Sequence, residues 1–194
     1  MRTLIAVAAL AFAAPALADK TDGIVPGILI GPKLGIVNFP TPTIGVETKI
    51  GRWFGVSFDY GLVPDITISN VTVNWNNWYI GGRVFPFQGS FFLGALYGHR
   101  SFSGSAVDTG TGLKGTADAS SDYLAPEIGW RWIWDSGLFM GIDLGWQFVT
   151  SNSKTVVIPG GFDPQKQKDI NDATDKLGTA GLPVLGLLQI GFFF

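Results

Sequence analysis

The chain has no cysteine and few charged residues, which removes several classes of protein from consideration. Without cysteine it can form no disulfide and no thiolate-bound metal site. Charged residues make up only 14% of the chain, the net charge is −2 and no basic run is present, so a nucleic-acid partner is not expected. Beyond residue 18, no stretch reaches the ~20 apolar residues of a membrane-spanning helix. Yet 46% of the residues are hydrophobic and the mean hydropathy is +0.30, which is typical of a chain that occupies a membrane.

Residues 1–18 have the pattern of a secretory signal peptide. Arg2 supplies an early positive charge, residues 4–14 are apolar, and Ala16-Leu17-Ala18 is a small-x-small cleavage site. The apolar run is too short to cross a bilayer as a helix. We therefore predict cleavage after Ala18 and one domain over residues 19–194; an uncleaved anchor is the alternative.

The rest of the chain alternates apolar residues with small or polar ones. Successive side chains of a strand point to opposite faces, so this alternation predicts strands with two unlike faces. Between residues 138 and 148, one face carries Leu, Met, Ile, Leu, Trp and Phe, while the other, from residue 141 on, holds Gly, Asp, Gly and Gln. A soluble barrel would turn its apolar residues inward and its charged residues outward. In this chain the large apolar residues lie on the face opposite the charged residues. With the charged face inside, this pattern predicts a barrel whose outer surface contacts lipid.

The spacing of the turn signals predicts an all-β fold, an eight-stranded antiparallel transmembrane β-barrel. Short turns are expected after the second, fourth and sixth strands and longer connections after the third, fifth and seventh, which is the pattern of outer-membrane barrels. We expect a polar loop over Gly104–Ser121 and a connection over Ser151–Gly181 that contains one short helix. Asp163-Pro164 would begin that helix and Gly178 would end it. A slip in the alternation between Asn74 and Asn77 predicts a bulge there.

Charged side chains fall on the inward face of the predicted strands. The interior of an eight-stranded barrel is just wide enough to be filled by side chains, so these residues should meet as a salt-bridged lumen network. The predicted members are Lys33, Glu47, Lys49, Asp59, Arg83, Arg100, Glu127, Arg131 and Asp143, accompanied by Gln147 and Gln189. Asp169, Asp172 and Asp175 recur along the predicted helix, where a solvated face is favoured over a calcium site because the glycine-containing loop of such sites is missing.

These features resemble the small eight-stranded outer-membrane barrels of the OmpA transmembrane-domain and OmpX type. The resemblance is carried by the signal peptide, the charged lumen, Trp130, Trp132 and Trp134 as girdle residues, and the terminal Phe194. It implies an outer-membrane location with both termini in the periplasm, and contact with outer-membrane lipid and lipopolysaccharide. It also implies that Phe192 and Phe194 form an assembly signal for the barrel-insertion machinery. No cofactor or metal is implied, and a peptidoglycan-binding role is not expected because no such domain follows Phe194.

Three functions are compatible with this architecture. The favoured one is non-enzymatic: a structural or surface-interaction barrel whose outer loops meet an unknown ligand. A narrow channel for small or hydrophobic solutes is the alternative, because many inward positions are glycine. The third rests on His99-Arg100-Ser101, an H-x-S triplet that resembles the catalytic pair of outer-membrane lipid A 3-O-deacylases, in which histidine activates serine. The residues after Ser101 do not match that family, and Glu127, the natural acid, has lumen parity.

Overall fold

The structure is a computed structural model that describes residues 27–37, 41–68, 71–107, 110–161 and 163–194. The predicted signal peptide lies outside the described residues. In chain order the elements are β1 (Ile28–Ile36), β2 (Pro42–Ile50), β3 (Phe54–Ile68), β4 (Val71–Val84), β5 (Phe91–Val107), β6 (Lys114–Ile133), β7 (Leu138–Trp146), β8 (Phe148–Val157), α2 (Pro164–Thr179) and β9 (Pro183–Phe192). In the part of the chain that the structure describes, no helix is long and apolar enough to cross a membrane.

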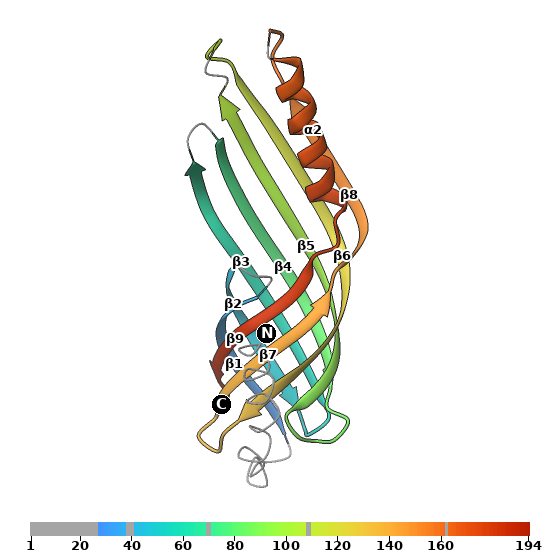
Figure 1. Cartoon of the computed structure of the whole chain (residues 1–194). Helices are drawn as coiled ribbons and strands as arrows, with labels where there is room; N and C mark the ends of the chain where they lie inside the picture. Colours follow the sequence, from blue (N-terminus) through green and yellow to red (C-terminus); the bar gives the residue numbers. More distant parts are fainter. Residues whose placement is uncertain (1–26, 38–40, 69–70, 108–109, 162) are drawn as a thin grey trace, which may run out of the picture.

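The strands close into a barrel of eight antiparallel strands (Figure 1). The hydrogen-bonded order is β5-β4-β3-β2-β1-β9-β7-β6, and the pairing of β5 with β6 closes the ring. β8 follows β7 after a break at Gln147 and continues along β6, so β7 and β8 together occupy one position in the barrel. The predicted eight-stranded barrel, with one helix among the described residues, is therefore confirmed.

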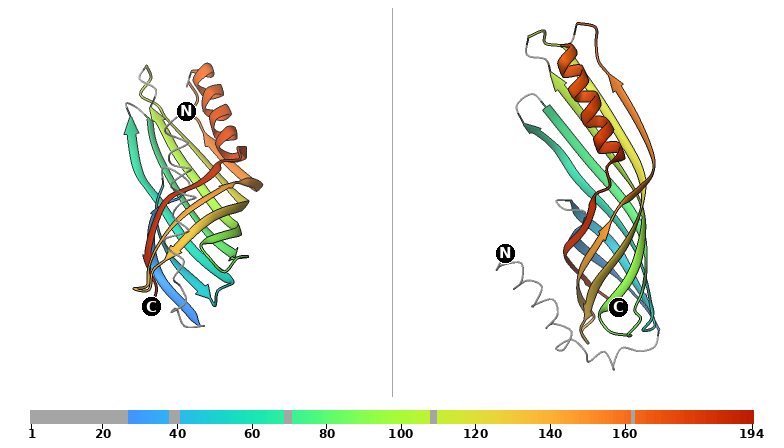
Figure 2. Two further views of the ribbon diagram at one scale, coloured as in Figure 1. Left: turned by 60° about the horizontal axis from the view of Figure 1, so that its bottom comes forward. Right: turned by 45° about the vertical axis from the view of Figure 1, so that its right-hand side comes forward.

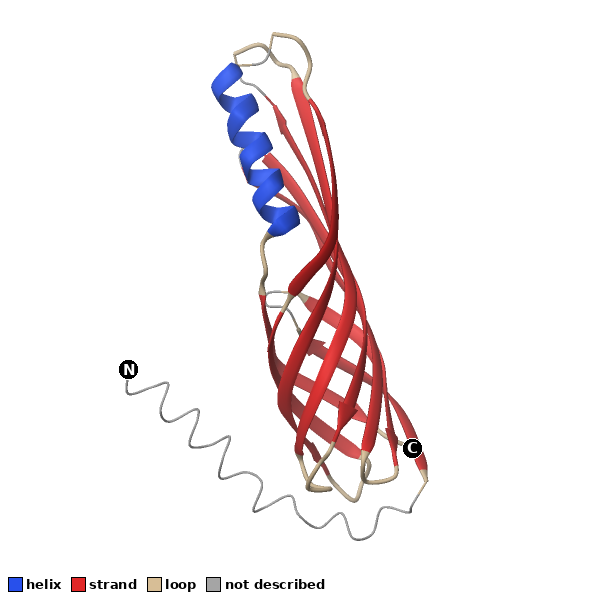
Figure 3. Cartoon of the chain, turned by 90° about the vertical axis from the view of Figure 1, so that its right-hand side faces the viewer, coloured by secondary structure: helices blue, strands red, loops and turns tan. Residues whose placement is uncertain are grey.

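The two ends of the barrel are unlike. Three short turns, at residues 51–53, 85–90 and 134–137, lie at the end that also holds the C-terminus (Figure 1). At the other end, β3, β4, β5, β6 and β8 run well past the ends of β1 and β2 (Figures 2 and 3). We call this part the extension: β3 from Leu62, β4 up to Asn76, β5 from Ser101, β6 up to Ser120, β8 and α2. The helix packs against β6 and β8.

In the closed part of the barrel, the outer face is apolar and the inner face polar. Most outward side chains are hydrophobic, and many are exposed, for example Ile28 at 70%, Leu34 at 63% and Ile44 at 61%. The inward columns are buried and include charged residues on seven strands, β1 to β7. This is the polarity that the alternation predicts, and it reverses the arrangement of a soluble barrel.

The polarity changes again in the extension. On β5 the outward column passes from Leu93 and Tyr97 to Ser103, whereas the inward column continues through the buried Phe102 to Gly104 and Ala106. On β6 the outward column runs from Leu124 to Asp118, and the inward Ala119 is buried. An apolar inner face needs a cover when the outer face meets water, and α2 provides it.

Several sequence predictions about this end were wrong. Most of the predicted polar loop Gly104–Ser121 is strand, because β5 extends to Val107, β6 begins at Lys114 and the two pair along their length. The predicted connection over residues 151–181 contains most of β8 as well as α2. The helix itself begins as predicted, since the Asp163 carboxylate accepts a hydrogen bond from the Gln165 N–H at 2.8 Å.

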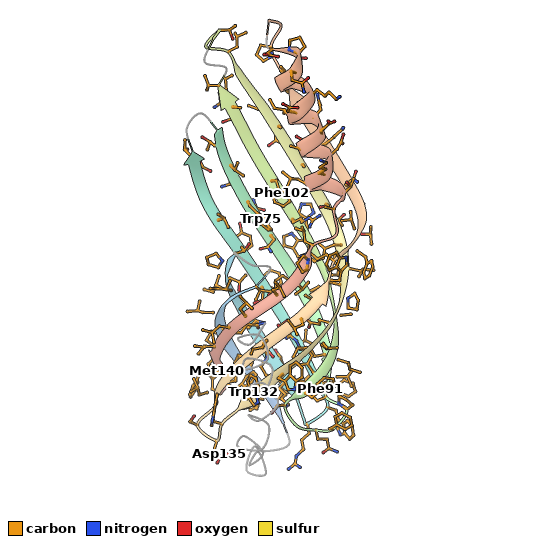
Figure 4. The ribbon with its side chains drawn as sticks, in the orientation of Figure 1. Trp75, Phe91, Phe102, Trp132, Asp135 and Met140 are labelled. Carbon is orange, nitrogen blue, oxygen red and sulfur yellow. The ribbon has the colours of Figure 1, made fainter. Side chains whose placement is uncertain are left out.

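The bulge and one girdle residue also differ from expectation. The register shift lies between Val63 and Ile66 on β3, not within Asn74–Asn77 on β4. Proline has no N–H to donate to the ladder, so Pro64 is the physical reason for a bulge there. Trp132, predicted as a girdle residue, is only 8% exposed. It lies near Met140 at the short-turn end (Figure 4), but it is not one of the exposed aromatic residues there.

Candidate functional sites: the barrel lumen and the His99 cluster

Charged side chains from six strands form one layer inside the closed part of the barrel. Each is inward because it occupies the polar parity of its strand, and each is no more than 3% exposed. The layer contains Lys33 of β1, Glu47 of β2, Asp59 of β3, Arg83 of β4, Glu127 and Arg131 of β6, and Asp143 of β7.

Two arginines connect the acids across the lumen. Arg131 Nε lies 2.9 Å from Glu47 Oε1, and its Nη2 lies 3.3 Å from Asp143 Oδ1. Arg83 Nε lies 3.0 Å from Glu127 Oε1, and its Nη2 lies 3.3 Å from Asp143 Oδ2. The planar fork of a guanidinium lets each arginine bind two or more carboxylates at once, which suits a crowded interior.

Lys33 completes the layer on the side of the β1–β9 seam. Its Nζ lies 2.8 Å from Asp59 Oδ2 and 3.3 Å from Glu47 Oε2. Gln189 of β9 accepts a hydrogen bond from Lys33 and donates one to Asp143. The layer thus joins the first and last strands to the rest of the barrel through side chains as well as through backbone.

The structure places two of the predicted network residues apart from this layer. Lys49 is buried, and its Nζ lies 4.1 Å from the centroid of the Phe85 ring, a cation–π contact. Arg100 lies further toward the extension, where it donates to Ser121 at 2.8 Å, to Gln147 at 2.8 Å and to the carbonyls of Leu177 and Ala180. All four partners of Arg100 are neutral, and two of them belong to the end of α2 and the residue just after it.

Apolar layers lie on both sides of the charged layer. Toward the short turns, the buried Phe139 ring stacks on Phe193 at 4.4 Å, with Ile133 in the same cluster. Toward the extension, a second buried cluster contains Val37, Tyr79, Leu96, Tyr123, Ala125 and Val184. Sequence reasoning did not single out these residues for the lumen, although inward parity was the available signal for most of them. Val184 is the exception, because the alternation counted back from Phe194 places it outward, and the register shift between Gly186 and Gln189 turns it inward.

The histidine lies on the outer face, at the level where that face changes from apolar to polar. His99 Nδ1 lies 2.7 Å from Asp122 Oδ1, and the two residues are paired directly across β5 and β6. Ser151 donates to the other carboxylate oxygen of Asp122 at 2.6 Å. Sequence reasoning missed Asp122 because a residue 23 positions away becomes a neighbour only through the hairpin register.

Ser101 shares the outward face of β5 with His99. Its hydroxyl donates to the Asn76 side-chain oxygen at 2.8 Å. The ring of Trp78, which is paired with His99 across β4 and β5, stacks on the His99 ring with centroids 6.2 Å apart. An acid, a histidine and a serine therefore occupy one patch, with the serine turned toward Asn76.

The predicted assembly residues lie at the seam of the barrel. The side chains of Phe192 and Phe194 are exposed, by 45% and 73%. The Phe194 N–H donates to the Ile30 carbonyl at 3.1 Å, and its carbonyl accepts from the Ile30 N–H. The terminal residue is thus paired through its backbone while its ring is free to contact a partner.

No protein-family model and no curated protein matches the chain. Among solved structures, it is similar to Acinetobacter baumannii CarO, with a TM-score of 0.49 and 12% identity over 90% of this chain and 100% of that one. It is also similar to A. baumannii CarO2, with a TM-score of 0.48 and 8% identity over 86% of this chain and 98% of that one. A third similar structure is a major outer membrane protein from Thermus thermophilus, with a TM-score of 0.46 and 16% identity over 86% of this chain and 99% of that one. Each TM-score is below 0.5, so the barrel assignment depends on the strand pairings of this chain.

Proposed function

We propose that this chain is a bacterial outer-membrane barrel with a structural or surface-interaction role, and that its lumen is closed to solutes. The closed part would span the membrane, both termini would lie in the periplasm, and the extension would project outside the cell. The observation that carries the proposal is the buried layer of paired charges that connects β1, β2, β3, β4, β6 and β7 across the lumen.

The outer surface supports the membrane location. Leaving so many large apolar side chains in water would be unusual for a soluble monomer, whereas a bilayer accepts them. The backbone also fits, because a closed ring of strands leaves no unpaired sheet edge in the lipid.

Inward glycines are the feature that would favour a channel, and their surroundings argue against it. The space beside several of them is filled by a neighbouring lumen side chain. A Cβ at Gly94 would lie 2.8 Å from Glu127 Oε1, one at Gly98 would lie 2.5 Å from the Tyr123 ring, and one at Gly129 would lie 2.6 Å from the Phe92 ring. These glycines make room for large side chains, which leaves that room unavailable to a water path.

Conductance of the refolded protein in a planar lipid bilayer tests the closed lumen. We expect no steady openings. Steady openings whose size follows the salt concentration would contradict the proposal and favour the channel.

The surface role predicts that the extension is dispensable for barrel formation. Replacing residues 148–181 by a short glycine-rich turn should leave a barrel that still shows heat-modifiable mobility in gel electrophoresis. The measurement compares this variant with the full chain after refolding into vesicles. Failure of the shortened chain to form a barrel would assign α2 and β8 a role in folding instead.

A second candidate function follows from the hydrogen bond between Asp122 and His99. An ionised Asp122 that accepts the Nδ1–H of His99 leaves Nε2 free to take a proton, which is the arrangement of a serine hydrolase. Ser101 Oγ, once turned from Asn76, would attack the carbonyl carbon of an ester in the outer leaflet while His99 takes its proton. The ester C–O bond then breaks, His99 returns the proton to the leaving alkoxide, and water hydrolyses the acyl-serine by the same exchange.

Mass spectrometry of lipid A from an expressing strain tests this candidate. Loss of one ester-linked acyl chain with the wild type and with Ser103→Ala, but not with Ser101→Ala, would support it. Ser103 is a matched control because it is exposed on the same strand face. Lipid A that the wild-type protein leaves unchanged would remove the candidate.

A further inference from the structure

The extension contains an apolar pocket between α2 and the inner face of the sheet. Its volume is about 140 Å³. Val73 of β4, Phe102 of β5 and Ala119 of β6 line the sheet side, and Ile170 and Leu177 line the helix side. Every other lining residue is Gly, Ala, Ser or Thr, so the pocket contains no charged side chain. An ion or a strongly polar solute would lose its hydration there without compensation.

Small residues keep the pocket open on the sheet side. Gly104 and Ala106 of β5 face Gly115 and Ala117 of β6 across the hairpin, where larger side chains would reach the helix. Part of the lining remains exposed, including Val73 at 41% and Leu177 at 43%. Exposed apolar side chains around a concavity are the usual mark of a site for an apolar ligand.

Polar contacts hold the helix and prevent it from collapsing into this space. Lys154 Nζ on β8 lies 2.5 Å from Asp175 Oδ1 on the helix. Arg100 donates to the carbonyls of Leu177 in the last turn of α2 and of Ala180 just after it, where a helix leaves carbonyls without partners of its own. The helix is therefore anchored through its C-terminal half, by Arg100 of β5 and Lys154 of β8.

Phe102 forms the aromatic wall at the base of the pocket. Its ring packs on Trp75 with centroids 4.7 Å apart (Figure 4). The Arg100 guanidinium, two residues nearer the closed part on β5, lies 5.8 Å from the Phe102 centroid. The Arg100 cluster thus lies between the pocket and the barrel interior. A bound molecule would stay in the extension.

We propose that this pocket binds a small uncharged hydrocarbon-like solute, of about the size of one benzene ring, taken from the external water. The size follows from the volume, since an apolar cavity of about 150 Å³ accommodates benzene. The source follows from the position, because the pocket lies beyond the level at which the outer face turns polar, where membrane acyl chains would not reach it. This site is independent of both functions proposed above.

Photolabelling of the full-length barrel in phosphatidylcholine nanodiscs tests the proposal. The probe is trifluoromethyl-phenyldiazirine, and toluene is the competitor. We expect label on the tryptic peptide of residues 169–176, which carries Ile170, Ala173 and Thr174 of the pocket, and we expect toluene to reduce it. Lipid-facing strand β7 should be labelled in every variant and is the internal reference.

Two variants fill the pocket from opposite sides, and a third variant, outside the pocket, is the matched control. Ala106→Leu and Ala173→Leu should each reduce labelling of residues 169–176 by at least about tenfold, because added methylenes occupy the binding volume. Ala95→Leu adds the same bulk to the outward face of β5 and should leave that labelling unchanged. Label on β7 without label on the helix would overturn the proposal. Equal labelling of the helix in all variants, or no competition by toluene, would also overturn it.

Discussion

Arg131 Nε lies 2.9 Å from Glu47 Oε1 and joins β6 to β2, two strands that share no backbone pairing. The two side chains meet across the lumen, 84 residues apart in sequence. Asp143 binds both Arg131 and Arg83, so neither arginine depends on one acid alone. The interior of the closed barrel is consequently held by side chains that span its width.

Removing one member of this layer should be costly. Arg131→Leu leaves Glu47 and Asp143 buried with fewer partners, and we expect a loss of about 3–5 kcal/mol in the free energy of unfolding. Guanidinium unfolding of the barrel in lipid vesicles measures it. Lys154→Leu is the control, because the Lys154–Asp175 pair is about half exposed and should contribute no more than about 1 kcal/mol. Equal effects of the two substitutions would contradict the role of the lumen layer.

The seam between β1 and β9 should tolerate no added atom at Gly31. A Cβ there would collide with the backbone carbonyl of Phe192, which cannot rotate away as a side chain can. Gly31→Ala should therefore lower the free energy of unfolding by about 1–3 kcal/mol, the usual cost of overpacking. Gly82→Ala is the matched control, since a Cβ at that position meets nothing within 4 Å. Unchanged stability of Gly31→Ala in the same vesicle assay would show that the seam relaxes.

Arg100 should control the mobility of α2. Arg100→Met removes the donors that bind the carbonyls of Leu177 and Ala180. We expect faster amide hydrogen exchange over residues 164–179, with unchanged protection of β7. Hydrogen exchange followed by mass spectrometry reads both regions in one experiment. Exchange in α2 that matches the wild type would mean that Lys154 and the apolar stripe suffice to hold the helix.

The terminal phenylalanine should matter for assembly in the cell more than for stability. Phe194 keeps its backbone pairing with Ile30 after substitution, and its ring is 73% exposed, so Phe194→Ala should refold in vitro like the wild type. In cells, we expect less heat-modifiable barrel in the outer membrane. Phe87→Ala, which removes another exposed ring from the short-turn end, is the comparison. Equal outer-membrane levels of the two variants would remove the assembly role.

The inward and outward columns could be predicted from the sequence because the side-chain period of a strand is two. Lys33, Glu47, Arg83 and Asp143 could each be assigned to the lumen from their own strand alone. Their partners could not, because which acid meets which arginine depends on how the strands are staggered around the ring. Lys49 and Arg100 show this limit. Both have the expected inward parity, yet Lys49 contacts the Phe85 ring and Arg100 donates to neutral groups such as Gln147.

The extension was the part least accessible from sequence. Residues 104–121 are small and polar enough to suggest a loop, yet pairing along β5, β6 and β8 makes residues 104–107 and 114–121 strand. A strand with polar outward residues and only Gly and Ala facing inward has no clear alternation, so the pattern that identified the other strands was absent. The cover supplied by α2 is a tertiary contact. On the helix only Ile170, Ala173 and Leu177 form an apolar stripe, and a stripe alone does not show which surface it covers.

By itself, the sequence determined the architecture: an eight-stranded barrel with an apolar outer face, a charged lumen and one helix. Those features depend on local alternation and on turn residues, which act within a few positions of one another. Only the tertiary structure decided which charges pair, that Asp122 is the partner of His99, and that a pocket lies beneath α2. The physical reason is register: such contacts join residues on different strands, and their distances follow from the closure of the whole sheet.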